Sequence, residues 1–216
     1  MKKLETTISI KNNTLVLIPE KAIFWQEEKA LIVADLHIGK ANHFRKSGLA
    51  VPEAANKENF EKLLSCMMAY KPEKVIFAGD LFHSAYNQAW EEVGEFLQNF
   101  KHIQFYLTIG NHDVLSLHQY EKFGLHVVER YSKNGIEITH HPEILTNGNY
   151  NLAGHIHPGF RLTGKAKQTI TLPCFYFGEK NGILPAFGIF TGLSKIEIKD
   201  NDQLYVITNQ TILKVA

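Results

Sequence analysis

Short apolar runs separated by polar turn residues dominate the first part of the chain. Runs of this length and composition favour β-strands. We expect strands at Thr7–Ile10, Thr14–Ile18, Ala22–Trp25 and Leu31–Ala34.

The pattern then alternates between helical and strand periods. Pro52-Glu53 opens a helical pattern, with proline in the first turn and acidic residues after it, and this helix ends before Lys71-Pro72. An apolar strand at Lys74–Ala78, a helix at Asn87–Phe100 and a strand at Ile103–Ile109 follow. The order is strand, helix, strand, helix, strand.

The second half is mostly β, with turns marked by Gly, Asn or Pro and little helix. Two sheets packed face to face with helices outside would bury both sets of strands. No Gly/Ser linker or charge run separates the halves, so we expect one domain over residues 1–216. The strands expected here are Val127–Val128, Ile136–Thr139, Tyr150–Ala153, Thr169–Leu172, Phe175–Phe177, Lys195–Ile198 and Gln203–Ile207.

Composition limits the class of protein. The 216 residues, 44% hydrophobic and 21% charged, are those of an ordinary globular domain. A net charge of +1 excludes a strongly basic nucleic-acid wrapper but leaves room for a local basic patch. Cys66 and Cys174 stand in apolar runs without a CxxC spacing, which favours buried thiols. The basic start lacks an apolar run for a signal peptide or membrane span, so we expect a cytoplasmic protein that does not contact membranes.

Five short polar motifs stand where apolar runs stop. Singly, each is a common turn; as an ordered set they are not explained by turns, which do not require histidine. Carboxylate, amide and imidazole at five strand ends predict one site that holds a pair of divalent metal ions. The motifs are Asp35-Leu36-His37, Gly79-Asp80, Gly110-Asn111-His112-Asp113, His140-His141-Pro142 and Gly154-His155-Ile156-His157.

The spacing within the motifs suits metal ligation. Asp35 and His37 leave one face of an extended backbone, and His155 and His157 repeat that spacing, although the latter two need not serve one ion. The two oxygens of Asp80 can bridge two cations. Mixed oxygen and imidazole ligands point to Mn²⁺ first, with Fe or Zn²⁺ as alternatives.

The order of these motifs resembles the calcineurin-like metallophosphoesterase superfamily from Asp35 to His157. The resemblance implies an α/β fold, a four-layer α/β/β/α sandwich of two mixed sheets flanked by helices, with a dinuclear metal site at the strand ends. It implies one metal held by Asp35, His37, Asp80 and His157, and a second held by Asp80, Asn111, His140 and His155. Asp80 would then be the bridge. Composition alone cannot decide whether His140 or His141 is the ligand, and the resemblance favours His140.

A closer resemblance is to the bacterial ligase-associated DNA-damage-response endonucleases. It implies a DNA substrate and DNA ligase, helicase and exonuclease as repair partners. The segments that carry it are Leu17-Ile18-Pro19-Glu20-Lys21-Ala22, Gly39-Lys40, Gly48-Leu49-Ala50-Val51-Pro52-Glu53, Leu172-Pro173-Cys174-Phe175 and Leu184-Pro185-Ala186-Phe187-Gly188.

The expected chemistry is phosphoester hydrolysis. Two cations about 3.5 to 4 Å apart can hold a bridging water as hydroxide and clamp the phosphoryl oxygens during in-line displacement. We expect His112, next to the ligand Asn111, to protonate the leaving oxygen or stabilise the transition-state charge, with Asp113 fixing its tautomer. His83 and His43 are weaker candidates for phosphate contact.

Two further segments have two interpretations each. Lys40, Arg45 and Lys46 form either a stretch that receives a phosphate backbone or a solvated helix face. Phe175-Tyr176-Phe177 suits base stacking, but its period-2 apolar spacing favours a core strand.

Three functions fit the sequence. The leading one is a metal-dependent phosphodiesterase that acts on nucleic acid. Activity on phosphodiesters distinguishes it from the others. A small-molecule phosphomonoesterase or nucleotide pyrophosphatase would use the same metals, and the near-neutral charge mildly favours it. A non-catalytic scaffold is disfavoured by the complete ligand set.

Overall fold

Seven strands from the first part of the chain form one mixed sheet in the order β1-β2-β3-β4-β5-β6-β7. The computed structural model describes residues 4–40, 55–164, 168–209 and 211–216. Pairing is antiparallel from β1 to β4 and parallel from β4 to β7. The strands are β1 (Thr6–Ile10), β2 (Asn13–Ile18), β3 (Ala22–Trp25), β4 (Ala30–Val33), β5 (Lys74–Phe77), β6 (Gln104–Thr108) and β7 (Leu125–Val128).

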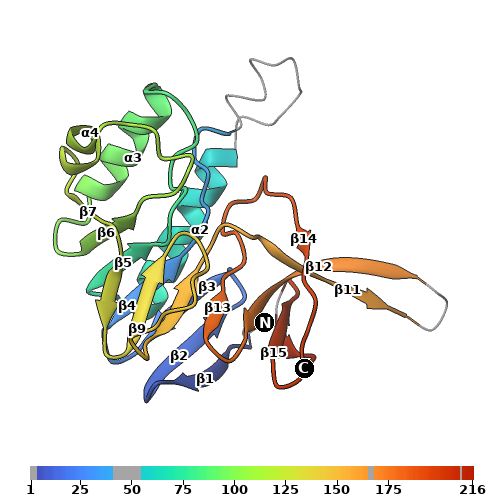
Figure 1. Cartoon of the computed structure of the whole chain (residues 1–216). Helices are drawn as coiled ribbons and strands as arrows, with labels where there is room; N and C mark the ends of the chain where they lie inside the picture. Colours follow the sequence, from blue (N-terminus) through green and yellow to red (C-terminus); the bar gives the residue numbers. More distant parts are fainter. Residues whose placement is uncertain (1–3, 41–54, 165–167, 210) are drawn as a thin grey trace.

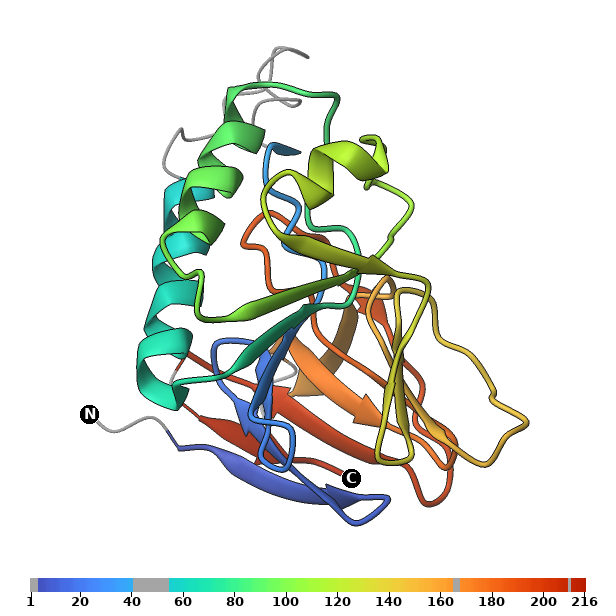
Figure 2. The same cartoon turned by 90° about the vertical axis from the view of Figure 1, so that its left-hand side faces the viewer.

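Three helices pack in one apolar cluster with this sheet: α2 (Ala55–Tyr70), α3 (Gln88–Gln98) and α4 (Leu117–Glu121). Figure 2 shows α2 and α3 side by side along one side of the molecule. Trp90 of α3 is fully buried, and its ring lies 5.2 Å from that of Phe82, in the loop that follows β5. The side chain of Asn87 accepts a hydrogen bond from the Ala89 N–H and so caps the first turn of α3.

The second sheet is built from the rest of the chain, in the order β14-β11-β12-β13-β10-β9-β8, with β15 pairing both β12 and β16. Strands β9, β10 and β13 run parallel to one another. In Figure 1 the β11–β12 hairpin extends away from the body of the molecule. The strands are β8 (Tyr131–Lys133), β9 (Ile136–Thr139), β10 (Tyr150–Ala153), β11 (Pro158–Thr163), β12 (Thr169–Phe177), β13 (Asn181–Ile183), β14 (Ser194–Lys195), β15 (Gln203–Ile207) and β16 (Ile212–Lys214).

The two sheets share one buried apolar layer. Trp25 and Ile32 of the first sheet belong to the same cluster as Leu152 and Phe175 of the second, and all four side chains are fully buried. A smaller cluster around Cys174 and Leu204 buries residues of the second sheet together with the non-helical segment that carries Ile196 and Ile198. The predicted α/β sandwich of two mixed sheets is confirmed. In the described ranges, every helix belongs to the cluster of the first sheet.

Most of the predicted strands are present within one or two residues of their expected ends. The two strands expected at Thr169–Leu172 and Phe175–Phe177 are one strand, β12, which runs through Pro173. Residues up to Pro173 pair with β11 and residues from Cys174 pair with β15, so the residue that lacks an N–H stands where the partner changes. The predicted strand at Lys195–Ile198 is reduced to β14.

No helix among the described residues has the length and apolar character needed to cross a membrane. Cys66 and Cys174 are buried free cysteines, as expected. Phe175 and Phe177 lie in the core between the sheets, so the core-strand interpretation of that aromatic segment is confirmed.

Candidate metal centre

The predicted metal ligands follow the carboxyl ends of parallel strands from both sheets. In open sheets of this kind the carboxyl ends of parallel strands form the edge at which ligands bind. Asp35 follows β4, Asp80 follows β5 and Asn111 follows β6, whereas His140 follows β9 and His155 follows β10. The site is therefore assembled between the two sheets.

One group of ligand atoms joins the two sheets through Asp35, His37 and His157, whose donor atoms lie within 4.8 Å of one another. His157 Nε2 lies 3.5 Å from Asp35 Oδ1 and 3.4 Å from His37 Nε2. Asp35 is fully buried and His37 nearly so. These are three of the four side chains that the family resemblance implies for the first metal.

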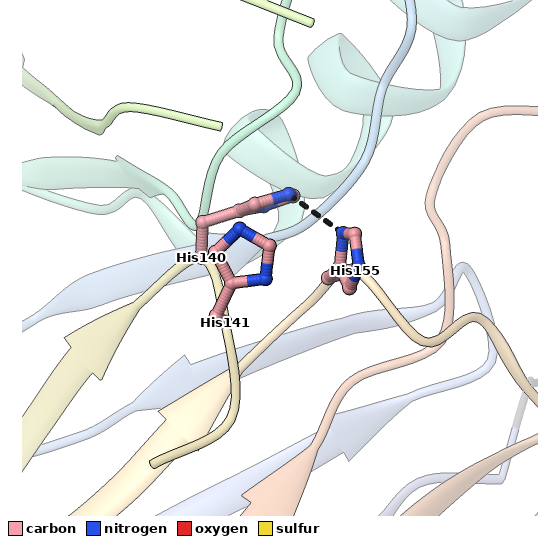
Figure 3. A group of neighbouring side chains, drawn as sticks. All are labelled: His140, His141 and His155. Carbon is pink, nitrogen blue, oxygen red and sulfur yellow. Dashed lines mark hydrogen bonds between the residues drawn. The ribbon is translucent and has the colours of Figure 1, made fainter. Parts of the chain in front are cut away.

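A second group gathers around His140. Its Nε2 lies 3.1 Å from His155 Nδ1 and 2.9 Å from Asn111 Oδ1. Figure 3 shows the rings of His140, His141 and His155 gathered together, and their donor atoms also lie within 4.8 Å of one another. The structure therefore brings both histidines of the pair at 140 and 141 near His155, with His140 buried and His141 exposed.

Asp80 lies between these two groups. Its Oδ2 is 3.8 Å from His37 Nε2, and its Oδ1 is 3.6 Å from His140 Nε2. Asp35 of the first group also lies near the second group, with its Oδ1 3.9 Å from His140 Nδ1. Two carboxylates thus connect the imidazoles of the two groups, and Asp80 has one oxygen toward each.

The spacing of these atoms fits ligands around common ions. Atoms about 2.0–2.2 Å from one ion, at angles of about 90–110°, lie roughly 2.8–3.6 Å apart. The shortest contacts within each group, 3.4 and 3.5 Å around His157 and 2.9 and 3.1 Å around His140, fall in this range. Carboxylate, amide and imidazole donors are also the set that divalent transition metals prefer. The residues present therefore fit two divalent cations.

Local electrostatics favour the metal-binding form of the histidines. Burial, together with the positive charge of Lys40 and the neighbouring imidazoles, lowers the pKa of His37 to about 2. Burial and the neighbouring His140 and His141 also lower the pKa of His155. A neutral imidazole offers the lone pair that a metal requires, so the surroundings prepare both side chains to act as ligands.

The backbone at five predicted ligands is left-handed. A positive φ is uncommon for residues other than glycine, costs free energy and is concentrated at functional sites. The surrounding loops must therefore hold these residues in place. The φ values are 54° at Asp35, 49° at His37, 50° at Asp80, 68° at His155 and 53° at His157.

Two glycines allow the loops of the opposite sheets to meet. A Cβ on Gly79 would lie 2.1 Å from His140 Nδ1, and a Cβ on Gly154 would lie 2.6 Å from Asp35 Oδ2. In each pair one residue belongs to the first sheet and the other to the second. In each of the Gly-Asp and Gly-His motifs, the second residue is a predicted ligand, and the glycine leaves room for a predicted ligand from the facing sheet.

His112 lies at the exposed side of the site. Its side chain is 41% exposed, its Nε2 is 4.0 Å from Asp80 Oδ2, and its backbone N–H donates to Asp80 Oδ1. The ring of His83 stacks on it at a centroid distance of 3.7 Å. The sequence makes His83 only a weak candidate for phosphate contact, because a histidine near a helix start is more often a solvated or capping residue, although His83 stands close to Asp80 in the chain.

Asp113 has partners other than the expected one. Its Oδ1 accepts the Phe82 N–H and its Oδ2 accepts the Gly110 N–H. Within the described ranges, no hydrogen bond joins Asp113 to the ring of His112, in contrast to the expected fixing of that tautomer. Burial raises the pKa of Asp113 to about 7. Its carboxyl group joins the loops that follow β5 and β6, and so supports the residues around Asp80 and Asn111.

Of the basic stretch considered in the sequence, Lys40 is described and Arg45 and Lys46 lie outside the described residues. Burial lowers the pKa of Lys40, and the nearby Asp80 and Asp35 oppose that shift, which places this cation beside the site. His43 and the expected helix start at Pro52-Glu53 also lie outside the described residues.

Two mixed sheets thus bring aspartates and histidines together where their parallel strands end. A family model described as calcineurin-like phosphoesterase matches residues 29–178. The chain belongs to the calcineurin-like phosphoesterase family, as its motifs indicated, and is therefore a metal-dependent hydrolase.

Similar solved structures include two bacterial proteins. The Pseudomonas putida nuclease MPE is 27% identical, with a TM-score of 0.83, over 98% of this chain and 100% of that one. The E. coli phosphoesterase YfcE is 17% identical, with a TM-score of 0.47, over 87% of this chain and 98% of that one. A comparison with curated proteins gives no match. The resemblance to a bacterial nuclease thus extends over nearly the whole chain.

Proposed function

We propose that this protein is a dinuclear metal-dependent phosphodiesterase that cleaves DNA. The observation that carries the proposal is the position of Asp80, with one carboxylate oxygen toward His37 and the other toward His140. A carboxylate that faces two imidazole groups suits a bridging ligand. The likeness to a nuclease over 98% of this chain supports nucleic acid as the substrate.

The two metals would be held by the ligands expected from the sequence. Asp35, His37 and His157 would share the first ion with Asp80, and Asn111, His140 and His155 would share the second with it. When bound, such ions supply an activated water and neutralise the charge on the phosphoryl oxygens. We propose Mn²⁺ as the physiological metal, since imidazole and oxygen donors are mixed.

His112 would act on the leaving group. It is the exposed imidazole beside Asp80, and it is held by its backbone bond to Asp80 and by the ring of His83. A protonated His112 would give its Nε2 proton to the departing oxygen, a role that contributes about 10²–10⁴-fold in rate in other enzymes. Asp113 would hold the loop that carries it, and Lys40 would contribute positive charge for phosphate.

A role in DNA repair in the cytoplasm, with ligase, helicase and exonuclease partners, belongs to the same proposal and rests on the family resemblance. A small-molecule phosphomonoesterase or nucleotide pyrophosphatase is the second candidate, and the net charge of +1 favours it mildly.

One assay separates these functions. Metal-free protein is loaded with Mn²⁺, its bound metal is counted, and it is given an alkyl phosphodiester, a phosphomonoester, single-stranded DNA and double-stranded DNA. The proposal requires two ions per chain and cleavage of DNA. Activity on monoesters alone would refute the nuclease function, and failure to retain or rebind two metals would favour a scaffold.

A further inference from the structure

The loop that carries Asp35 and His37 is held on two sides by backbone hydrogen bonds. On one side, the Asp35 N–H donates to the Gly79 carbonyl at 3.1 Å and the His37 N–H donates to the Asp80 carbonyl at 2.9 Å. On the other side, the N–H of Gly188 donates to the carbonyl of Asp35 at 3.1 Å. These bonds leave the carbonyl of Leu36, between the two ligands, to find another partner.

Asn59 of helix α2 supplies that partner. Its Nδ2 donates to the Leu36 carbonyl at 3.2 Å, and its Oδ1 accepts the N–H of Ile189 at 3.3 Å. Asn59 is 4% exposed and Leu36 is 1% exposed, so water has little access to the groups that Asn59 satisfies. A buried carbonyl without a donor is costly, and roughly 90% or more of the buried backbone groups in native proteins have a partner.

The amide of asparagine fits this position for a chemical reason. Leu36 presents an acceptor and Ile189 presents a donor, and the asparagine amide offers a donor and an acceptor on two separate atoms. An aspartate would keep the bond from Ile189 but lose the bond to Leu36. An alanine would lose both.

Asn59 belongs to a polar stripe on α2 that is spaced three residues apart. One turn before it, the Asn56 side chain accepts the N–H of Gly39; one turn after it, Lys62 Nζ donates to the Phe187 carbonyl. Residues at i and i+3 lie on one face of a helix. The stripe formed by Asn56, Asn59 and Lys62 therefore holds the loop after β4 and the segment around Phe187 against one another.

We propose that Asn59 is a positioning residue for the metal ligands Asp35 and His37. Both ligands have left-handed backbones, with φ of 54° and 49°, which persist only if their surroundings fix them. Asn59 fixes the peptide between them. Without its donor, the loop relaxes toward ordinary backbone angles, and the carboxylate of Asp35 and the imidazole of His37 lose their common orientation.

The test is metal binding by Asn59→Asp and Asn59→Ala. This inference rests on the proposed two-metal function, so Mn²⁺ titrations followed by electron paramagnetic resonance first count the ions that the unaltered protein binds. We expect both variants to bind one Mn²⁺ with unchanged affinity and the other roughly tenfold more weakly. Turnover of a phosphodiester should recover at saturating Mn²⁺, with kcat near that of the unaltered protein.

Met67→Ala is the matched control. Met67 is 4% exposed and lies on the same helix, two turns beyond Asn59, so its truncation weakens helix packing without touching the Leu36 carbonyl. It should lower the melting temperature and leave both Mn²⁺ affinities unchanged. Alanine keeps helix propensity, so Asn59→Ala provides a folded variant if Asn59→Asp does not fold.

Two results would overturn the positioning role of Asn59 and the two-metal function, and they can be told apart. If the variants melt earlier but bind both ions as tightly as the unaltered protein, Asn59 is only structural. If the unaltered protein itself does not bind two ions, the proposed two-metal function fails, and the role of Asn59 in positioning ligands of such a site fails with it.

Discussion

The ring of His83 stacks on the ring of His112, with centroids 3.7 Å apart and planes 29° apart. The Nδ1 of His83 also lies 3.2 Å from the Nδ1 of His37. The histidine that we propose as the proton donor is thus connected through a second imidazole to a proposed metal ligand. The orientation of His112 therefore depends on a residue that is neither ligand nor donor in the proposed mechanism.

We expect His112→Asn to retain both metals and to lose DNA cleavage by about 10²–10⁴-fold. An aryl phosphodiester, whose leaving group needs no proton, should be affected far less than DNA. Parallel rates on the two substrates, with metal counted in each sample, check this. Full turnover on an unactivated diester with two bound metals would remove the proposed role.

Removal of the stacking ring should act through His112. We expect His83→Ala to slow DNA cleavage, and the double variant with His112→Asn to be little slower than His112→Asn alone, since residues that act together are not additive. A double-mutant cycle on DNA cleavage rates measures this. Multiplicative effects of the two substitutions would show that His83 acts independently of His112.

Gly79→Ala should disrupt the metal centre. The new Cβ would lie 2.1 Å from His140 Nδ1 on a backbone with φ of 79°, so the imidazole must move and Mn²⁺ affinity should fall. Gly124→Ala is the matched control, because Gly124 has φ of 83° and no atom within 4 Å of a new Cβ.

The control should lose about 1–2 kcal/mol from backbone strain alone, and Gly79→Ala about 1–3 kcal/mol more from the clash. Denaturant unfolding and Mn²⁺ titration of both variants measure these effects. Equal metal affinities in the two variants would show that the contact between Gly79 and His140 is unimportant for binding.

The stability of the protein should depend on pH through Lys62. Burial lowers the pKa of Lys62 in the folded protein to about 7, from its ordinary value of 10.5. Between these two values the unfolded chain binds the proton and the folded chain does not, so this group makes the free energy of unfolding rise with pH. The slope from one proton is about 1.4 kcal/mol per pH unit.

Lys62→Met removes the amine that titrates and keeps most of the apolar volume of the side chain. We expect the rise in the free energy of unfolding between about pH 7 and pH 10 to be reduced in the variant, as measured by urea denaturation at a series of pH values. Identical slopes for the two proteins would mean that Lys62 keeps its proton in the folded state.

The sequence predicts the elements whose apolar runs end at clear turn residues and misses those without such a signal. Strands such as β3 and β9 match their expected bounds because their apolar runs are bounded by clear turns. Strands β8, β11, β13 and β16 and helix α4 are not predicted. Strand β11 opens on Pro158-Gly159, a pair that indicates a turn, and the other four elements are not bounded by comparably clear apolar runs. Only β13 among them pairs with a strand from well before it in the chain, Asn181 lying opposite Asn151 of β10, whereas β8 pairs with the adjacent β9.

The motifs at the strand ends predict which side chains gather, and the structure brings all seven proposed metal ligands to one edge. What the sequence does not reveal is how they are supported. Asn59 and Asp113 act through backbone groups of other loops, and His83 acts through a ring contact, so their roles depend on three-dimensional neighbours that no local pattern encodes. Family motifs report the chemistry, whereas these contacts follow from packing.

Each proposed ion takes ligands from both sheets, because Asp35 and Asp80 follow strands of the first sheet and His155 and His157 follow a strand of the second. Bound ions would therefore act as cross-links through the sandwich, at the end where the buried apolar layer stops. Loss of an ion then requires ligands from both sheets to release it, and any motion between the sheets makes that release easier. A core substitution that loosens the packing between the sheets, such as Phe175→Leu, should therefore accelerate the removal of metal from the folded protein by a chelator.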